Sequence, residues 1–200
     1  SPRQRRFHAR PLARSGRCAP FDVSASGLIV GEGAGIVVLK RLADALRDGD
    51  RIHALIRGIG LSNDLDGNLL SPSSEGQLRA LRQAYRQAGW SPDLVDLIEC
   101  HATGTPVGDA VEFESLSRLW QDGPWQPAQC VLGAVKANIG HLLTAAGAAS
   151  LIKILLALRH QTLPATANFQ QPGGKIPLDG SPFRILQTSQ PWQQRAAGIP

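Results

Sequence analysis

The chain has 200 residues, of which 42% are hydrophobic and 18% are charged, and its formal net charge is +5. This apolar content excludes a disordered chain and suits one ordinary domain or a piece of a larger one. Six arginines stand in the first 17 residues, SPRQRRFHARPLARSGR. Such a run can hold a phosphate backbone. Because no nucleic-acid-binding motif follows it, we expect a solvated, irregular basic segment over residues 1–27 and no nucleic-acid partner.

The cysteines and the longest apolar run indicate the setting of the protein. Cys18, Cys100 and Cys130 are odd in number, lie far apart and form no CxxC pair. This pattern predicts a reducing, cytoplasmic setting without a disulfide framework. The basic start has no apolar core, so we expect no signal peptide. The apolar run LLTAAGAASLIKILLAL (142–158) contains Lys153 and is at the lower length limit for crossing a bilayer. We therefore predict a buried helix and no membrane span.

The predicted elements begin with a glycine cluster in LIVGEGAGIVVLKRL (28–42). A dinucleotide loop needs a strand, glycines and then a helix. Here the glycines lead into IVVLK, so we predict close backbone packing and a strand at 36–40. The pattern then predicts these elements in chain order: a short helix ended by Gly49, a strand at 52–62, a polar loop at 63–68, a helix ended by Gly89, a strand at 94–100, a helix at 108–120, a strand at 130–135, a helix at 141–159, a segment rich in proline and glycine at 161–182, and a strand at 183–187. The alternation of strands and helices indicates an α/β layered fold.

A polar stretch, ECHATGTPVGDAVE (99–112), directly follows the apolar strand LVDLI. If the chain stays extended to residue 105, His101, Thr103 and Thr105 point to one face and the residues between them point to the other. Open α/β sheets usually bind ligands at the carboxyl ends of their strands. Taken alone, the stretch is equally compatible with a capped strand-to-helix turn that contains a hydrogen-bonded histidine.

A second stretch, VLGAVKANIGHLLTAAGAASLIK (131–153), repeats the sequence of strand, polar turn and helix and supplies Lys136 and His141. Near a helix start, the positive helix end opposes protonation of His141 and keeps its imidazole neutral. Two neutral imidazoles, from His101 and His141, can aim two N–H donors at one oxygen that gains negative charge. The alternatives are a surface lysine at 136 and an N-terminal cap at 141. No ligand spacing predicts a metal site.

The two stretches together resemble the paired histidine motifs of β-ketoacyl synthases, and more narrowly of ketosynthase domains in type I polyketide or polyunsaturated fatty acid synthases. PFDVSASGLIVGEGAGIVVLKRL and PATANFQQP fit the same family. The resemblance implies a thiolase-like fold of alternating helix and sheet layers. It implies a decarboxylative Claisen condensation between an acyl thioester and a malonyl-type unit on acyl carrier protein.

The same resemblance assigns roles to individual residues. His101 and His141 match the pair that stabilises the enolate oxygen, and Lys136 matches the lysine that organises this pair. Thr103 and Thr105 match the threonines that bind the phosphopantetheine arm of the carrier. Asp109 and Glu112 are expected to be structural. The resemblance also implies a homodimer, other synthase domains as partners and no cofactor bound by this domain.

The sequence departs from the family pattern because it holds no DTACSS-like stretch with the nucleophilic cysteine and no GFGGTNAH-like closing segment. We therefore expect residues 28–200 to be the carboxyl-terminal part of a ketosynthase domain. We expect this chain to be inactive in condensation by itself. Cys18 in a loop, Cys100 on the opposite face and Cys130 in a core strand are poor substitutes for the nucleophile. The alternative is a non-condensing relative that serves as a structural or chain-length-setting subunit.

Overall fold

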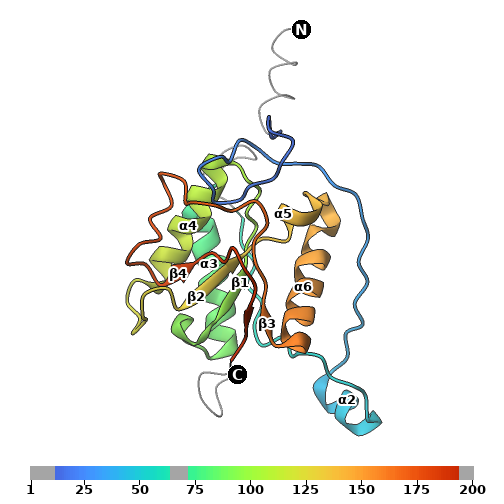
Figure 1. Cartoon of the computed structure of the whole chain (residues 1–200). Coiled ribbons are helices and arrows are strands. Elements are labelled where there is room, and N and C mark those ends of the chain that lie inside the picture. Colours follow the sequence, from blue (N-terminus) through green and yellow to red (C-terminus); the bar gives the residue numbers. More distant parts are fainter. Residues whose placement is uncertain (1–11, 64–71, 194–200) are drawn as a thin grey trace.

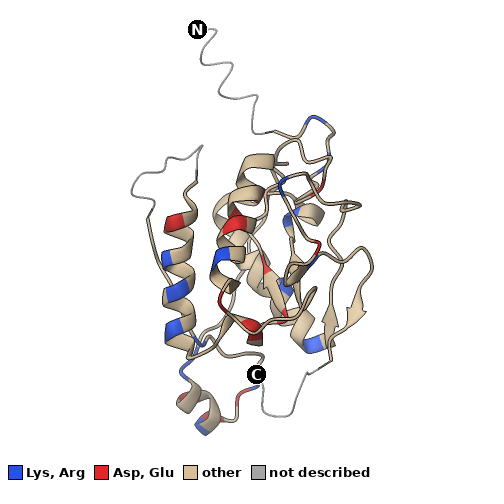
Figure 2. Ribbon diagram, turned by 90° about the vertical axis from the view of Figure 1, so that its left-hand side faces the viewer, with Lys and Arg blue, Asp and Glu red and all other residues tan. Residues whose placement is uncertain are grey.

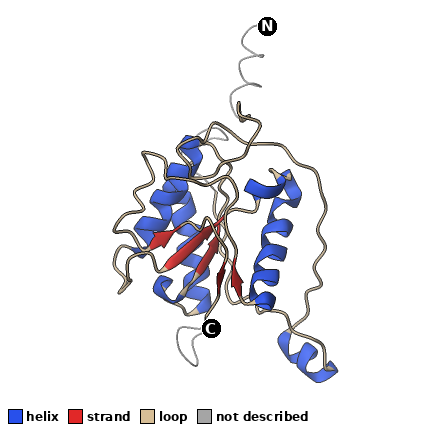
Figure 3. Cartoon of the chain, viewed as in Figure 1, coloured by secondary structure: helices blue, strands red, loops and turns tan. Residues whose placement is uncertain are grey.

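The computed structural model describes residues 12–63 and 72–193. A sheet of three parallel strands lies between helices on its two faces (Figures 1 and 3). Its strands, in spatial order, are β1 (Leu97–Glu99), β2 (Cys130–Gly133) and β4 (Phe183–Arg184). Helices α3 (Ser74–Ala88) and α4 (Pro106–Trp120) lie on one side, and α6 (Ala146–His160) lies on the other. The smaller elements are α2 (Leu42–Asp48), η1 (Pro92–Leu94), α5 (Lys136–Ile139), η2 (Leu143–Ala145) and an antiparallel pair, β3 (Thr162–Leu163) with β5 (Gln190–Pro191).

The central strand β2 joins two hydrophobic clusters because successive side chains of a strand point to opposite faces. Cys130 and Leu132 belong to the larger cluster, which includes Trp120 of α4. Val131 belongs to the smaller cluster, which includes Ala157 of α6. All four residues of β2 are buried. The polar turn that follows β2 therefore leaves a rigid core.

The helices on the α3 and α4 side follow the predicted periodicity. Helix α3 ends where Gly89 adopts a left-handed conformation, and α2 ends in the same way at Gly49. Helix α4 begins two residues before its predicted start, with Pro106 at its first position, where the missing N–H costs no helical hydrogen bond. These ends are set by local residues, which explains why the sequence locates them. Figure 2 marks the positions of the charged residues along the ribbon, including those on the helices.

The strands predicted at 36–40 and 52–62 are wrong. Both segments lack assigned secondary structure, because no strand among residues 12–63 and 72–193 hydrogen-bonds to them. The first segment runs down the side of α6 to α2 (Figure 1). The second rests on α3, and its approach is so close that a Cβ at Gly60 would lie 1.7 Å from the Ala80 carbonyl oxygen. The predicted backbone packing is therefore present without strand pairing.

Three other predictions need revision. Helix α6 begins at Ala146, five residues after its predicted start, because α5 and η2 occupy the intervening turn. We predicted a buried helix, but only Ala146 and Ala157 of α6 are buried among the residues described. The strand predicted at 183–187 is confined to Phe183–Arg184. The polar loop predicted at 63–68 lies outside the described residues except for its first residue.

Candidate active site

The structure brings the two predicted histidines together. His101 follows β1 and His141 follows β2, and these strands are parallel neighbours, so both turns leave the same edge of the sheet. The centroids of the two imidazole rings lie 5.4 Å apart, with an interplanar angle of 80°. At this separation one small substrate atom can contact donors from both rings.

Two carboxylates of α4 hold the turn that carries His101. Glu112 accepts hydrogen bonds from the backbone N–H groups of His101, at 2.6 Å, and Ala102, at 2.7 Å. Asp109 accepts hydrogen bonds from the backbone N–H of Phe21, at 2.8 Å, and of Gly104, at 3.2 Å. Burial raises the pKa of Asp109 to about 6 and the pKa of Glu112 to about 7. These contacts are structural, as expected for both residues.

The backbone of the segment before α2 holds His141 in place. The His141 N–H donates to the Ile29 carbonyl at 2.7 Å, and the Gly31 N–H donates to the His141 carbonyl at 3.1 Å. The imidazole Nδ1 of His141 accepts a hydrogen bond from the Leu143 N–H at 3.0 Å. An accepting Nδ1 places the proton of the neutral ring on Nε2. The hydrogen-bonding geometry thus assigns the free donor of His141 to Nε2.

Desolvation and the charge of Lys136, more than a helix end, favour neutral imidazoles, although His101 is exposed and His141 is half-buried. Desolvation, then the charge of Lys136 and then His141 lower the pKa of His101 from 6.5 to about 4. Desolvation and then Lys136 lower the pKa of His141. The predicted cause was a helix start at His141, but α6 begins only at Ala146. Both rings are therefore uncharged at neutral pH for a reason that the sequence pattern did not identify.

Lys136 is buried, with 3% of its surface exposed, as the first residue of α5. Burial contradicts the alternative of a surface lysine. Glu99 at the end of β1 holds the preceding turn, because its carboxylate accepts hydrogen bonds from the Val135 N–H and, at 2.6 Å, from Lys153 Nζ. Sequence reasoning missed Glu99, although a carboxylate at the end of an apolar strand was a usable signal.

The two predicted threonines also lie together. Thr103 is buried and Thr105 half-buried, and their Oγ1 atoms are 2.9 Å apart. The backbone is not regularly extended as we had supposed, since φ is 33° at Ala102 and 78° at Gly104. A positive φ favours glycine, which accounts for that residue between the threonines. The two hydroxyls nevertheless form one polar group next to His101 in the sequence.

Asn168 is a second residue whose role was missed. Its side-chain Nδ2 donates to the Cys18 carbonyl at 2.9 Å and to the Ala137 carbonyl at 3.2 Å. It thereby connects the segment before α2 with the Lys136 helix. The stretch PATANFQQP that contains it fits the family pattern, but no local signal showed what the amide contacts.

The three cysteines are buried. Desolvation raises the pKa of Cys18 and of Cys100. A raised thiol pKa lowers the fraction of nucleophilic thiolate. Cys18 lies nearer to the site than its loop position suggested, because its Sγ is 3.5 Å from the Thr103 carbonyl oxygen. Among the residues that the structure describes, no cluster of three or more histidine, cysteine, aspartate or glutamate side chains could hold a metal ion.

The parallel sheet with helices on both faces and the paired histidines belong to part of a thiolase-like α/β domain, the fold of the ketosynthases on which the chain superposes. Residues 53–170 match the family model for the C-terminal domain of beta-ketoacyl synthases, and residues 5–45 match the model for the N-terminal domain. The chain belongs to the β-ketoacyl synthase family. The division of the chain at residue 27 stays a prediction.

Solved structures and curated relatives agree with this family. The ketosynthase from module 6 of the bacillaene synthase of Bacillus subtilis superposes with a TM-score of 0.91 at 36% identity, over 98% of this chain and 35% of that chain. One component of the phenolphthiocerol/phthiocerol polyketide synthase of Mycobacterium tuberculosis is 43% identical over 190 residues, 92% of this chain and 13% of the relative. Another component of that synthase is 42% identical over 182 residues, 90% of this chain and 12% of the relative. The chain thus spans a small part of these large synthases.

Proposed function

We propose that the chain is the histidine-bearing part of a ketosynthase domain in a polyketide synthase. In the proposed reaction, a malonyl-type thioester loses carbon dioxide, and the electrons of the broken C–C bond form an enolate. The enolate carbon then attacks the carbonyl carbon of an acyl thioester, a new C–C bond forms, the C–S bond breaks and the thiolate that carried the acyl group leaves. The matched relatives are polyketide synthase components and ketosynthases, so they do not favour the alternative of a non-condensing subunit.

The observation that carries this proposal is the pair of neutral imidazoles at the carboxyl ends of adjacent strands. His141 has its Nε2–H free, and the His101 ring lies 5.4 Å away. Two N–H donors aimed at one thioester oxygen stabilise the negative charge that develops there during decarboxylation. A neutral donor serves this purpose without a prior proton transfer, and the lowered pKa of His101 keeps that form at physiological pH.

The other predicted site residues act on binding and orientation. The Lys136 ammonium helps to keep both imidazoles uncharged and organises the pair. The adjoining hydroxyls of Thr103 and Thr105 bind the phosphopantetheine arm of an acyl carrier protein. The carrier brings this arm as part of the substrate, so the domain binds no cofactor of its own. The proposed setting is a cytoplasmic homodimer joined to other synthase domains.

We also propose that this chain alone does not condense thioesters. The reaction needs an acyl-accepting thiolate, whereas the thiols of Cys18 and Cys100 are buried and have raised pKa values. Cys130 is fully buried within β2. The nucleophile must therefore come from polypeptide other than these three residues.

A chimera tests the proposal, with this chain replacing the matching segment of the module 6 ketosynthase. His101→Ala and His141→Ala should each slow carbon dioxide release from a malonyl thioester by about 100-fold, the usual cost of losing one oxyanion donor. Lys136→Ala should lower turnover as well. The controls are Glu114→Ala on the exposed side of α4 and Lys175→Ala at an exposed lysine. Carbon dioxide release at the parental rate in both histidine variants would reject the proposed role.

A further inference from the structure

A single ion pair connects the two turns of the candidate site with α6. Glu99 ends β1, two residues before His101, and its Oε2 accepts a hydrogen bond from Lys153 Nζ at 2.6 Å. Its Oε1 accepts the N–H of Val135, the residue directly before Lys136. Lys153 belongs to α6, the helix that follows the second turn. One carboxylate therefore contacts both turns or their flanks and the helix.

The pair is shielded from solvent against the sheet. The Glu99 side chain is 4% exposed and the Lys153 side chain is 14% exposed. Gly133 of β2 lies opposite Glu99 in the parallel register and leaves room for both charges, because a Cβ there would lie 2.8 Å from Oε2 and 3.0 Å from Nζ. Opposite charges in such a place attract strongly, and removal of one of them leaves the other buried without compensation. The geometry of the pair therefore persists only while both partners are present.

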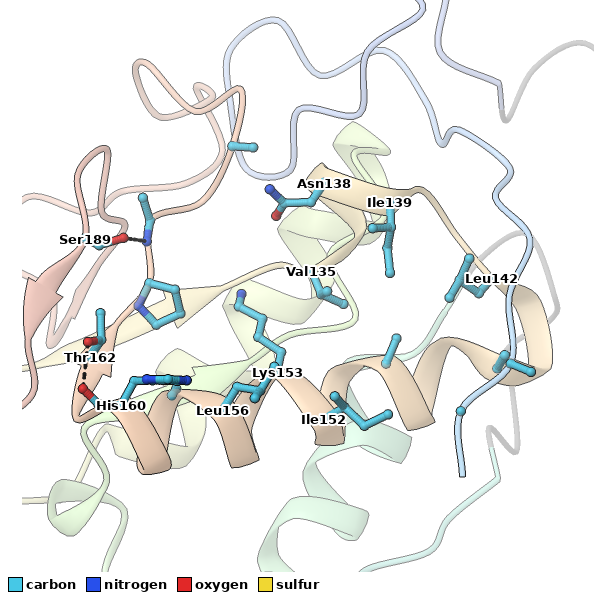
Figure 4. Close-up of a pocket in the computed structure, with 18 residues that line it drawn as sticks. Val135, Asn138, Ile139, Leu142, Ile152, Lys153, Leu156, His160, Thr162 and Ser189 are labelled. Carbon is cyan, nitrogen blue, oxygen red and sulfur yellow. Dashed lines mark hydrogen bonds between the residues drawn. The ribbon is translucent and has the colours of Figure 1, made fainter. Parts of the chain in front are cut away.

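The pair attaches a helix that buries few of its own side chains. Ala146 and Ala157 are the buried residues of α6 in the described part of the chain. In Figure 4, Lys153 extends from α6 into a cavity of about 970 Å³ between α6, α5 and the segment at Gly35. Leu143–His160 is long and apolar enough to cross a membrane by length and composition, and 11% of it is buried. The ion pair instead joins this stretch to the sheet by a charged contact within the protein.

We propose that Glu99 and Lys153 are positioning residues whose ion pair fixes the His101 turn relative to the turn that carries His141. Both side chains are engaged with each other on the α6 side of the sheet, so they act on the imidazoles through the backbone. The proposal rests on the proposed condensation, because a substrate oxygen that contacts both rings makes their relative position matter. Without the pair, the rings remain neutral donors but lose their fixed separation of 5.4 Å.

A purely structural ion pair would affect stability alone, and a double variant separates the two roles. Glu99→Gln combined with Lys153→Met leaves no unpaired charge, and neutral replacement of a whole buried pair often preserves stability. The amide oxygen at position 99 still accepts the Val135 N–H in this variant. The link to α6 is lost while the fold is retained, so any effect on the rings reports positioning.

The positions of the rings are measured in this chain with labelled histidine. At a centroid distance of 5.4 Å and an interplanar angle of 80°, ring protons of His101 and His141 are close enough for a nuclear Overhauser contact. This contact should lose most of its intensity in Lys153→Met and in the double variant with Glu99→Gln. Lys175→Met, at an exposed lysine, should keep it. An unchanged contact in the double variant overturns the proposal whether or not the domain condenses thioesters.

Turnover is measured in the chimera with the module 6 ketosynthase. The double variant should lower kcat for carbon dioxide release by about 100-fold, the cost of a displacement of about 1 Å. KM for the malonyl thioester should stay at the parental value, because neither side chain contacts the substrate. A parental kcat in a double variant with parental urea unfolding overturns the proposal. Loss of the ring contact, together with parental rates in His101→Ala and His141→Ala, rejects the proposed reaction but supports positioning of the rings by the pair.

Discussion

Replacing Lys136 by methionine removes one charge from the site and keeps nearly the same length of side chain. Three causes together lower the pKa of His101 from 6.5 to about 4, and the Lys136 charge is the second of them after desolvation. Because desolvation persists in the variant, less than half of the shift should be recovered. We expect the pKa of His101 in Lys136→Met to rise by about one unit. The pKa of His141 should rise too, since Lys136 is the second cause there.

The assay is an NMR titration of histidine ring carbons in this chain with labelled histidine. Lys175→Met makes the same substitution at an exposed lysine and should leave the titration of His101 at its parental value. Tryptophan fluorescence at each pH shows whether the fold is intact. A His101 pKa in Lys136→Met equal to the parental value would refute the argument that the lysine charge keeps the ring neutral, and desolvation alone would then account for the shift.

The remaining predictions concern stability and are read from urea unfolding. Burial raises the pKa of Glu112 from 4.5 to about 7, so the protein takes up a proton on folding in this pH range. The free energy of unfolding should therefore fall by about 3 kcal/mol in total as the pH rises from about 4.5 through 7. Glu112→Gln should remove this loss, and an equal loss in the variant would contradict the assignment. Gly60→Ala should destabilise the protein by more than about 1 kcal/mol, because the new Cβ would meet the Ala80 carbonyl. Gly147→Ala in α6, where a Cβ meets open space, should stabilise the protein by about 0.5–1 kcal/mol. Equal effects of the two substitutions would argue against the close approach of Gly60 to α3. Trp120→Ala should cost about 3–5 kcal/mol, since the ring is 1% exposed and packs on Phe183. Trp120→Phe should cost less, because it also removes a buried N–H that has no hydrogen-bond partner among the described residues. A cost under about 1 kcal/mol for the alanine variant would contradict the described core.

Features that depend on nearby residues were predictable from the sequence. Helix α3 was found from its apolar spacing and from Gly89, and both are local signals. The strands β1 and β2 were found as apolar runs, although each is shorter than predicted. The meeting of His101 and His141 was also predictable, because a polar turn after each of two parallel strands places both turns at one edge of the sheet.

Features that depend on distant partners were not predictable. The apolar residues at 36–40 have the composition of a strand, but a strand exists only when another segment hydrogen-bonds to it. No described residue does so here. The same limit applies to Asn168, whose amide contacts the Cys18 and Ala137 carbonyls across the fold. A pattern of single residues cannot reveal such a contact.

The geometry of the candidate site depends on carboxylates that the proposed reaction never uses. Glu112 holds the backbone at His101, Asp109 holds the backbone after Thr103, and Glu99 holds the turn before Lys136. These acids accept backbone N–H groups of the turns. A buried N–H that is left without a partner costs about 1–3 kcal/mol. The loops that carry the donors are thereby fixed before any substrate arrives, and preorganised donors lose no reorganisation energy when the charge develops. Replacement of one of these acids should therefore displace the imidazole rings but leave their ability to donate hydrogen bonds unchanged. The acids are thus positioning residues, and the imidazoles are the groups that contact the substrate.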